Sequence, residues 1–330
     1  MSVAQSEAAP SLDDKPIPYM GRTREYYAAL GYAAPYRWAH YPDVPFTPFD
    51  KPLASSRIAL VTTAAPYQPG KGDQGPRAAY NGAAKFFTVY SFGSDRDLDL
   101  RISHIAIDRA HTTAEDIGTW FPGNALRRAV ASARVGCVSP RFHGLPTNRG
   151  QRITAEVDAP ELVRRCIHDG VDAAILVPNC PVCHQSCAIA ARDLEAAGVA
   201  TVIMGCAKDI VEHVGVARFL FSDFPLGNAA GKPHDRQSQD ATLELALGLL
   251  ESATSPRTTL RSPLRWSDDP SWKLDYCNVD RLTDAELRRL REGFDAAKAA
   301  AEPAKTAGKP AIASVLASRI VLKKKFPTRW

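Results

Sequence analysis

Short apolar runs alternate with amphipathic stretches through the middle of this chain. Apolar runs that predict buried strands cover residues 57–63, 171–177, 199–204 and 217–221. Segments with helical periodicity cover residues 124–133, 159–169, 184–197 and 237–252. Strands that alternate with helices indicate parallel βαβ units. The pattern therefore predicts an α/β fold with a doubly wound, mostly parallel, Rossmann-like sheet.

Weaker patterns add further elements. Residues 100–107 alternate between apolar and polar side chains as a half-buried strand does, and residues 135–138 predict another short strand. Gly170 is expected to end the helix that precedes it. A long helix is predicted over residues 283–301, because Thr283 and Glu286 form a capping box at its start.

Three regions follow from this pattern. An extended N-terminal arm is predicted for residues 1–56; its first 17 residues are expected to be disordered, and aromatic side chains should anchor residues 36–52 on the core. The α/β catalytic core is predicted for residues 57–255, and a C-terminal helical segment with a basic tail for residues 256–330. Within this last region, a composition rich in Pro, Lys and Ala from residue 303 onward predicts a linker and an exposed tail.

Composition excludes several classes of protein. The formal charge of +5 on 330 residues is a mild excess, so it does not indicate a nucleic-acid partner. No run of about 18 apolar residues predicts a membrane span, and the N-terminus lacks the pattern of a secretory signal. We therefore expect a cytoplasmic protein, and also a homo-oligomer. In that reducing compartment, seven cysteines indicate redox or metal chemistry rather than a disulfide framework.

The most informative motif is the segment from Cys180 to His184, Cys-Pro-Val-Cys-His, which lies where a predicted strand turns into a helix. Unpaired N–H groups and the positive end of the helix dipole stabilise a thiolate at such a position. Cys180 is the candidate attacking thiolate and Cys183 the candidate resolving thiol, and an external dithiol would reduce the disulfide they form. His184 is expected to take a proton from a thiol or to pair with the thiolate.

Other interpretations of these cysteines stay open. They can be small packing residues at a helix–sheet interface. Alternatively, a zinc ion or an iron–sulfur cluster would have four thiolate ligands from Cys180, Cys183, Cys187 and Cys206. The motif also matches the attachment pattern for c-type haem, but that chemistry requires export and a largely helical domain. The preceding strand argues against haem.

Two further segments supply candidates for substrate binding or acid/base chemistry, with a structural role as the alternative for each. The first contains His104, Asp108 and His111. The second follows the predicted strand 217–221 and contains Asp223, Pro225 and Gly227. Because the carboxyl ends of parallel strands meet at one edge of a sheet, this loop, Cys180 and Cys206 should lie on the same rim. Cys180 and Cys206 are expected to face each other across a cleft there.

The residues around these motifs resemble a known family. Residues 179–186, residues 191–199 and the segment from Asp223 to Gly227 are similar to the glycine/sarcosine/betaine/D-proline reductase family, and in particular to its selenoprotein B type subunit. Residues 104–122, Trp266 and the pair Ser271-Trp272 resemble its non-selenium members. The resemblance covers roughly residues 57–300.

The resemblance implies a reductive cleavage of a C–N bond α to a carboxylate, in a small amino acid-like substrate. Cys180 matches the position of the family's selenocysteine, which attacks while the amine leaves, and Cys183 matches the resolving position. A partner reductase subunit or a thioredoxin-like donor is also implied, and a separate pyruvoyl subunit activates some of the family's substrates. Because a thiolate is a poorer nucleophile than a selenolate, a more easily cleaved substrate or a different thiol reaction is an alternative. A further alternative is a non-catalytic subunit of a reductase complex, which would bind its partner through the aromatic N-terminal arm and the basic tail.

Overall fold

A mostly parallel sheet forms the centre of the molecule. The computed structural model describes residues 12–32, 34–147 and 150–325, and in them the sheet has eight strands in the order β10-β9-β8-β7-β1-β6-β3, with β5 also paired to β1. The strands are β1 (Arg57–Thr62), β3 (Tyr90–Gly93), β5 (Cys137–Val138), β6 (Arg141–Gly144), β7 (Ala173–Val177), β8 (Ala200–Gly205), β9 (Arg218–Phe221) and β10 (Thr258–Arg261). Only β3 pairs antiparallel within this sheet. A separate two-stranded sheet pairs β2 (Ala65–Pro66) with β4 (Leu100–Arg101).

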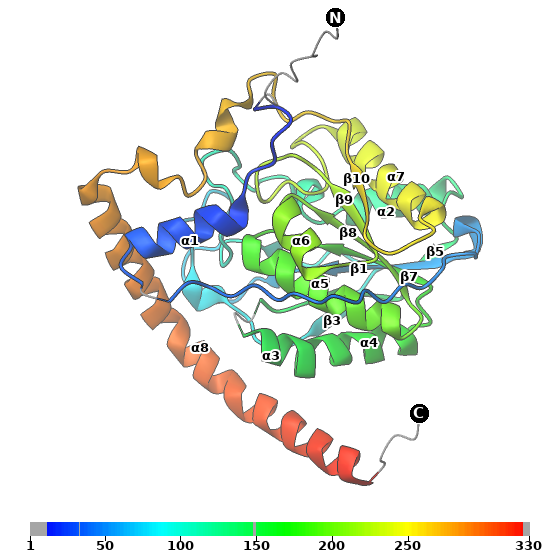
Figure 1. Ribbon diagram of the computed structural model, residues 1–330. Coiled ribbons are helices and arrows are strands. Elements are labelled where there is room, and N and C mark those ends of the chain that lie inside the picture. The colour runs from blue at the N-terminus through cyan, green and yellow to red at the C-terminus, as the bar shows by residue number, and fades with distance from the viewer. Residues whose placement is uncertain (1–11, 33, 148–149, 326–330) are drawn as a thin grey trace, which may run out of the picture.

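Helices cover both faces of the sheet, so the predicted doubly wound α/β fold is confirmed (Figure 1). The helices are α1 (Tyr19–Ala29), α2 (Gly123–Ala131), α3 (Gln151–Ile153), α4 (Ala159–His168), α5 (Pro181–Ala196), α6 (Lys208–Val214), α7 (Arg236–Ser252) and α8 (Asp284–Lys325). Alternate residues of β1 divide between two cores, because side chains of a strand point to opposite faces. Leu60 packs in one cluster with α2 and α7, whereas Val61 packs in the other with α4 and α5.

The order of the strands creates a crevice at one edge of the sheet. The chain runs from β1 to β6 on one side of β1, and then crosses to β7 on the other side; β8, β9 and β10 follow outward from β7. Because the two connections leave in opposite directions, the carboxyl ends of β1 and β7 flank a topological switch point, where α/β proteins bind ligands. Thr63 follows β1 at this crevice, and Asn179 and Cys180 follow β7.

The part of the N-terminal arm that follows α1 lies along α5 (Figure 1). The backbone N–H of Ala39 donates to Oε1 of Gln185 at 2.8 Å, and Nη1 of Arg192 donates to the carbonyl oxygen of Asp43 at 2.6 Å. The predicted disorder over residues 1–17 is wrong for residues 12–17, because the Lys273 ammonium donates to three of their backbone carbonyls. Residues 1–11 lie outside the described part of the chain.

A buried ion pair holds this arm to the sheet. Nη1 of Arg218 donates to Oε1 of Glu195 at 3.0 Å, and both side chains are inaccessible to solvent. The backbone N–H of Thr47 in the arm donates to Oε2 of Glu195 at 2.6 Å, and the carbonyl oxygen of Thr47 accepts from Nη2 of Arg218 at 2.8 Å. The ring of Phe46 lies 4.4 Å from the guanidinium carbon of Arg218. The arm therefore supplies hydrogen-bond partners to the buried Glu195 and Arg218 side chains, which have no access to water.

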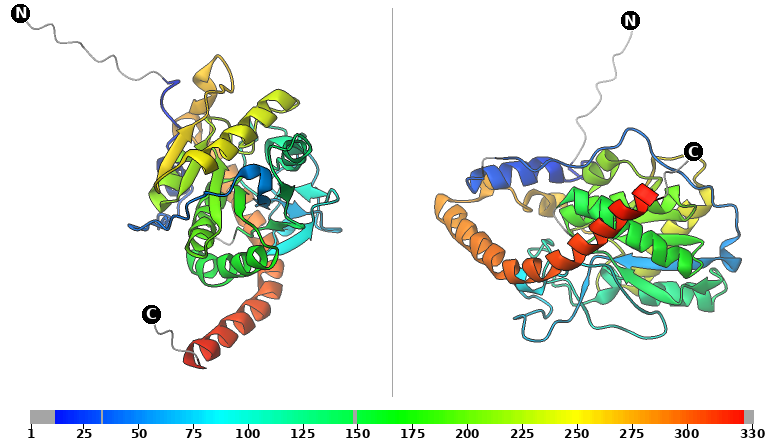
Figure 2. Two further views of the ribbon diagram at one scale, coloured as in Figure 1. Left: turned by 90° about the vertical axis from the view of Figure 1, so that its right-hand side faces the viewer. Right: turned by 90° about the horizontal axis from the view of Figure 1, so that it is seen from below.

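Several predicted boundaries differ from the structure. The sheet continues to β10, so the core extends beyond residue 255. Of the predicted strand 100–107, only residues 100–101 form a strand. The backbone then turns, and the N–H of Ile105 donates to the carbonyl oxygen of Ile102 at 3.2 Å. The predicted linker from residue 303 is instead part of α8, which runs to Lys325 and projects from the body (Figures 1 and 2). Among the described helices, none combines the length and apolar character needed to cross a membrane.

The contribution of the buried Arg218–Glu195 pair to stability can be measured. Replacing Glu195 with glutamine leaves the Arg218 charge buried without its counter-ion, so the free energy of unfolding should fall by about 3–5 kcal/mol. Urea denaturation at pH 7 measures this loss. The matched control is Glu156→Gln, which removes an exposed ion pair with Arg152 and should cost under about 1 kcal/mol. Equal losses in the two variants would contradict the role given to the buried pair.

Candidate active site

Cys180 is the N-cap residue of α5 at the switch point. Its backbone is extended (φ −132°, ψ 169°), and Pro181 occupies the first position of the helix, where the fixed proline φ favours helix initiation. The Cys180 sulfur accepts a hydrogen bond from the backbone N–H of Cys183 at 3.3 Å. α5 has 16 residues, so its dipole places positive potential at this sulfur. These features favour negative charge on Cys180.

The two thiols of the motif differ in burial and in chemistry. Cys180 is 5% exposed, whereas Cys183 is completely buried. Burial raises the pKa of Cys183 well above its ordinary value; its hydrogen bond to Cys180 and the negative charge there raise it further, against smaller opposing effects of Thr63 and Asn179. Cys183 therefore keeps its proton and directs it at the Cys180 sulfur. The geometry is consistent with an attacking Cys180 and a resolving Cys183.

Arg109 places a fixed positive charge beside the motif. Its guanidinium donates to three backbone carbonyls, those of Ala78 at 3.0 Å, Ile105 at 2.9 Å and Ser103 at 2.9 Å. Burial lowers the pKa of Arg109, while negative charge on nearby groups that include Cys180 opposes this shift. Since the attraction is mutual, the cation stabilises a thiolate at Cys180. Arg109 belongs to the predicted segment that contains His104, Asp108 and His111, but its contacts with backbone groups of other segments could not be predicted from the sequence.

Thr63, at the end of β1, connects the motif to the predicted segment around His104. Nδ2 of Asn179 donates to Oγ1 of Thr63 at 3.3 Å, and the same threonine interacts with the Cys183 thiol. His104 is buried next to the Thr63 backbone; burial, together with the charge of Lys85, lowers the pKa of His104 to about 3. His104 is therefore a neutral side chain close to the thiols. Its role in substrate binding or acid/base chemistry stays a prediction.

His184 is a positioning residue in this structure. Its Nδ1–H donates to the carbonyl oxygen of Cys180 at 2.7 Å, and its Nε2 accepts from the backbone N–H groups of Cys206 at 2.9 Å and Ala207 at 3.2 Å. Burial lowers the pKa of His184 to about 4, so the ring is neutral. The geometry does not support the predicted proton transfer or ion pairing with a thiol, because both ring nitrogens are engaged by backbone groups.

Gly205 makes this arrangement of His184 sterically feasible. A Cβ atom at residue 205 would lie 2.7 Å from Nε2 of His184, which is closer than such atoms approach in proteins. The glycine at the end of β8 therefore lets the imidazole reach the turn before α6. Sequence reasoning missed Gly205, because a single glycine after an apolar run indicates only the end of a strand.

Asp108 and His111 come together, as the sequence suggested, but they form a chain of polar contacts with a third residue. Nδ1 of His111 lies 3.1 Å from the Asp108 carboxylate, and its Nε2 lies 3.1 Å from Oδ2 of Asp275. Burial raises the pKa of Asp108, and the nearby His111 opposes this shift. Asp275 was missed, since it is 164 residues further along the chain. None of the hydrogen bonds of Asp108 and His111 described here reaches Cys180 or Cys183.

The loop with Asp223, Pro225 and Gly227 packs beside Cys206. Asp223 pairs with Lys273 at 2.6 Å and with Arg261 at 2.9 Å. The Cys206 thiol lies 3.8 Å from the Pro225 carbonyl oxygen, and burial raises the pKa of Cys206. Gly227 has a φ of +104°, a conformation that favours glycine. Cys180 and Cys206 are both buried in one hydrophobic cluster, so the expected open cleft between them is wrong.

The four cysteines proposed as metal ligands do not form one cluster. Cys187 packs in the core on the α4 and α5 face of the sheet, whereas Cys180, Cys183 and Cys206 belong to the core on the other face. In the parts of the chain that the structure describes, no group of three or more His, Cys, Asp or Glu side chains has the arrangement needed to hold a metal ion. The zinc and iron–sulfur alternatives therefore have no geometric support.

The fold and site together define an α/β protein with a dithiol motif at the topological switch point. The chain is similar to D-proline reductase subunit gamma of Acetoanaerobium sticklandii, at 28% identity over 197 residues, which are 59% of this chain and 78% of that relative. It is also similar to glycine reductase complex component B subunit gamma of Carboxydothermus hydrogenoformans, at 28% identity over 231 residues, or 66% of this chain and 48% of that relative.

The resemblance indicated by the sequence motifs is thus confirmed, since both relatives are subunits of reductases of the kind expected. The match spans about half the length of the glycine reductase subunit. No family model matches the chain, and neither does any solved structure.

The neutral, buried state of His184 predicts a specific pH dependence. An unfolded histidine has a pKa of about 6.5, so between pH 6.5 and about 4 the unfolded chain binds one more proton at this residue than the folded chain does. The contribution of the neutral His184 to the free energy of unfolding is complete above pH 6.5 and is lost as the pH falls toward 4. Replacing His184 with glutamine should reduce the slope of unfolding free energy against pH by about 1.4 kcal/mol per pH unit near pH 5.

Urea denaturation between pH 4.5 and 7 measures that slope. The comparison variant is His168→Gln, the same exchange at a side chain that is 74% exposed in the folded chain. A slope in the His184 variant equal to that of the wild type would contradict a neutral His184 in the folded protein.

Proposed function

We propose that this chain is the dithiol-bearing subunit of a reductase that cleaves a C–N bond in a small amino acid-like substrate. The observation that carries the proposal is the asymmetry of the Cys180–Cys183 pair. The Cys180 sulfur accepts a hydrogen bond at the start of α5, within electrostatic range of the partly buried Arg109, while Cys183 is held as a protonated thiol. The two similar reductase subunits support the class of reaction.

The proposed reaction transfers two electrons to the substrate. The Cys180 thiolate attacks the carbon that carries the nitrogen; a C–S bond forms, the C–N bond breaks, and the amine leaves with a proton. Thioether formation removes the negative charge that raises the pKa of Cys183, so the second thiol then ionises more readily. Cys183 attacks the Cys180 sulfur, the S–S bond forms, and the carbon leaves with the C–S electron pair and takes a proton. An external dithiol reduces the disulfide.

Partner proteins would supply an activated substrate and the reducing dithiol. Both relatives are named as subunits, which supports assembly of this chain with a further reductase subunit that presents an activated substrate. Activation matters because sulfur is a poorer nucleophile than selenium in this reaction. A thioredoxin-like protein is the proposed dithiol donor. The homo-oligomer and the cytoplasmic location stay predictions.

The proposal predicts which thiol reacts first. Iodoacetamide at pH 6 should label Cys180 at least tenfold faster than Cys277. The start of α5 stabilises a thiolate at Cys180, whereas the low-dielectric surroundings of the partly buried Cys277 raise its pKa to about 12. Peptide mapping by mass spectrometry measures the rates. Cys180→Ser should remove the fast phase and abolish reductive cleavage of D-proline or glycine by the assembled complex.

Two further variants complete this experiment. Cys183→Ser should keep the fast labelling of Cys180 and lose turnover, since no thiol resolves the intermediate. Cys277→Ser is the matched control and should change neither measurement. Fast labelling and turnover that persist in the Cys180 variant would overturn the proposed function.

A further inference from the structure

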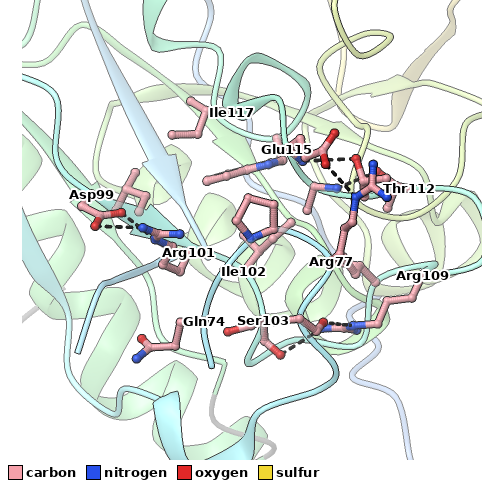
Figure 3. A pocket seen from close by; sticks show the side chains of 18 residues that line it. Gln74, Arg77, Asp99, Arg101, Ile102, Ser103, Arg109, Thr112, Glu115 and Ile117 are labelled. Carbon is pink, nitrogen blue, oxygen red and sulfur yellow. Dashed lines mark hydrogen bonds and ion pairs between the residues drawn. The ribbon is translucent and has the colours of Figure 1, made fainter. Parts of the chain in front are cut away.

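A pocket of about 460 Å³ lies between the loops of residues 74–78, 99–103 and 107–120 (Figure 3). Its volume lies within the range of small-molecule sites in proteins. Neither Cys180 nor Cys183 is among its lining residues. We propose that this pocket binds a small organic acid through its carboxylate, independently of the thiol chemistry.

Positive charge exceeds negative charge in the pocket. Arg77, Arg101 and Arg109 line it together with Asp99 and Glu115 (Figure 3). Arg77 gives only its Nε–H to Glu115, at 2.7 Å, and Arg101 gives its Nε and Nη2 groups to Asp99, at 2.6 and 3.1 Å. Terminal N–H groups of both arginines therefore stay available to a ligand, whereas the two carboxylates are already engaged. Arg109 also interacts electrostatically with Cys180, so Arg77 and Arg101 supply the donors that favour an anion here.

Two buried polar side chains that line the pocket lack a hydrogen-bond partner among the described residues. The atoms concerned are Oγ of Ser103 and Nε1 of Trp120. Ser103 is 4% exposed and Trp120 is 2% exposed. The indole nitrogen and the guanidinium groups only donate hydrogen bonds, so a ligand must accept from them, and the Ser103 hydroxyl, which can donate or accept, can donate to the same group. A carboxylate has two oxygens that accept, and it fits this set of donors.

The remaining walls define the other part of the ligand. Leu100, Ile102, Ile107 and Ile117 line the pocket, so the body attached to the carboxylate should be compact and apolar. The loops are also held in a demanding conformation. Arg77 has a φ of +66° and Ala114 has a φ of +58°, and strained residues of this kind gather at functional sites.

Binding of 3-phenylpropionate to the full chain tests the proposal, with 3-phenylpropanamide as the uncharged probe of the same shape. Isothermal titration calorimetry should show saturable binding of the carboxylate at one site, at least tenfold tighter than the amide. Arg101→Gln should weaken binding of the carboxylate at least tenfold, and Ser103→Ala should weaken it severalfold. Arg164→Gln, which changes an exposed arginine on α4, is the matched control and should bind normally.

Three results would overturn the proposal: no saturable binding of the carboxylate, equal affinity for the amide, or unchanged affinity in both pocket variants. Urea denaturation of each variant separates loss of binding from loss of folding, and Ser103→Ala gives the answer if Arg101→Gln does not fold. Calorimetry measures binding and not turnover, so a failure of this test leaves the proposed redox function untouched.

Discussion

The hydrogen bonds of one neutral histidine connect the two loops on which the candidate active site is built. His184 donates to the backbone of Cys180 after β7 and accepts from the backbone of Cys206 and Ala207 after β8. Gly205 provides the space that the imidazole occupies. These contacts of His184 with the backbone set the position of Cys180 at the start of its helix. They involve neither thiol, so ionisation of a thiol does not break them. The buried His184 thus positions the dithiol motif through hydrogen bonds to the backbone.

The electrostatic asymmetry of the two thiols follows from the same architecture. Helix α5 covers one face of the sheet, yet its first turn reaches around the edge at the switch point, so Cys180 and Cys183 pack in the core on the opposite face. Cys180 lies at the positive end of the helix and near Arg109, whereas Cys183 is one turn further in and is shielded from water. Burial alone would keep both thiols protonated. The fixed positive charge and the two hydrogen bonds from Cys183 are what distinguish Cys180.

The sequence was sufficient for the parallel core and for the motif, because both depend on local patterns. Apolar runs located β1, β7, β8 and β9, and the strand-to-helix position of Cys180 followed from its neighbours. Features made by distant segments were not predictable. Arg109 binds carbonyls across two loops, Asp275 meets His111 from far along the chain, and β10 lacks a strong apolar pattern. The prediction that His184 exchanges a proton or pairs with a thiol has no support in the structure, because the sequence does not show which atoms its ring nitrogens contact.

The central claim is that Cys180 and Cys183 form one two-electron couple. A redox titration of the full chain in glutathione buffers, quenched with acid and mapped by mass spectrometry, measures it most directly. A single transition with the slope of a two-electron couple is expected, in which the only new bond joins Cys180 to Cys183. Oxidation that leaves these two residues as separate thiols, or that joins Cys180 to Cys187 or Cys206 instead, would contradict the account.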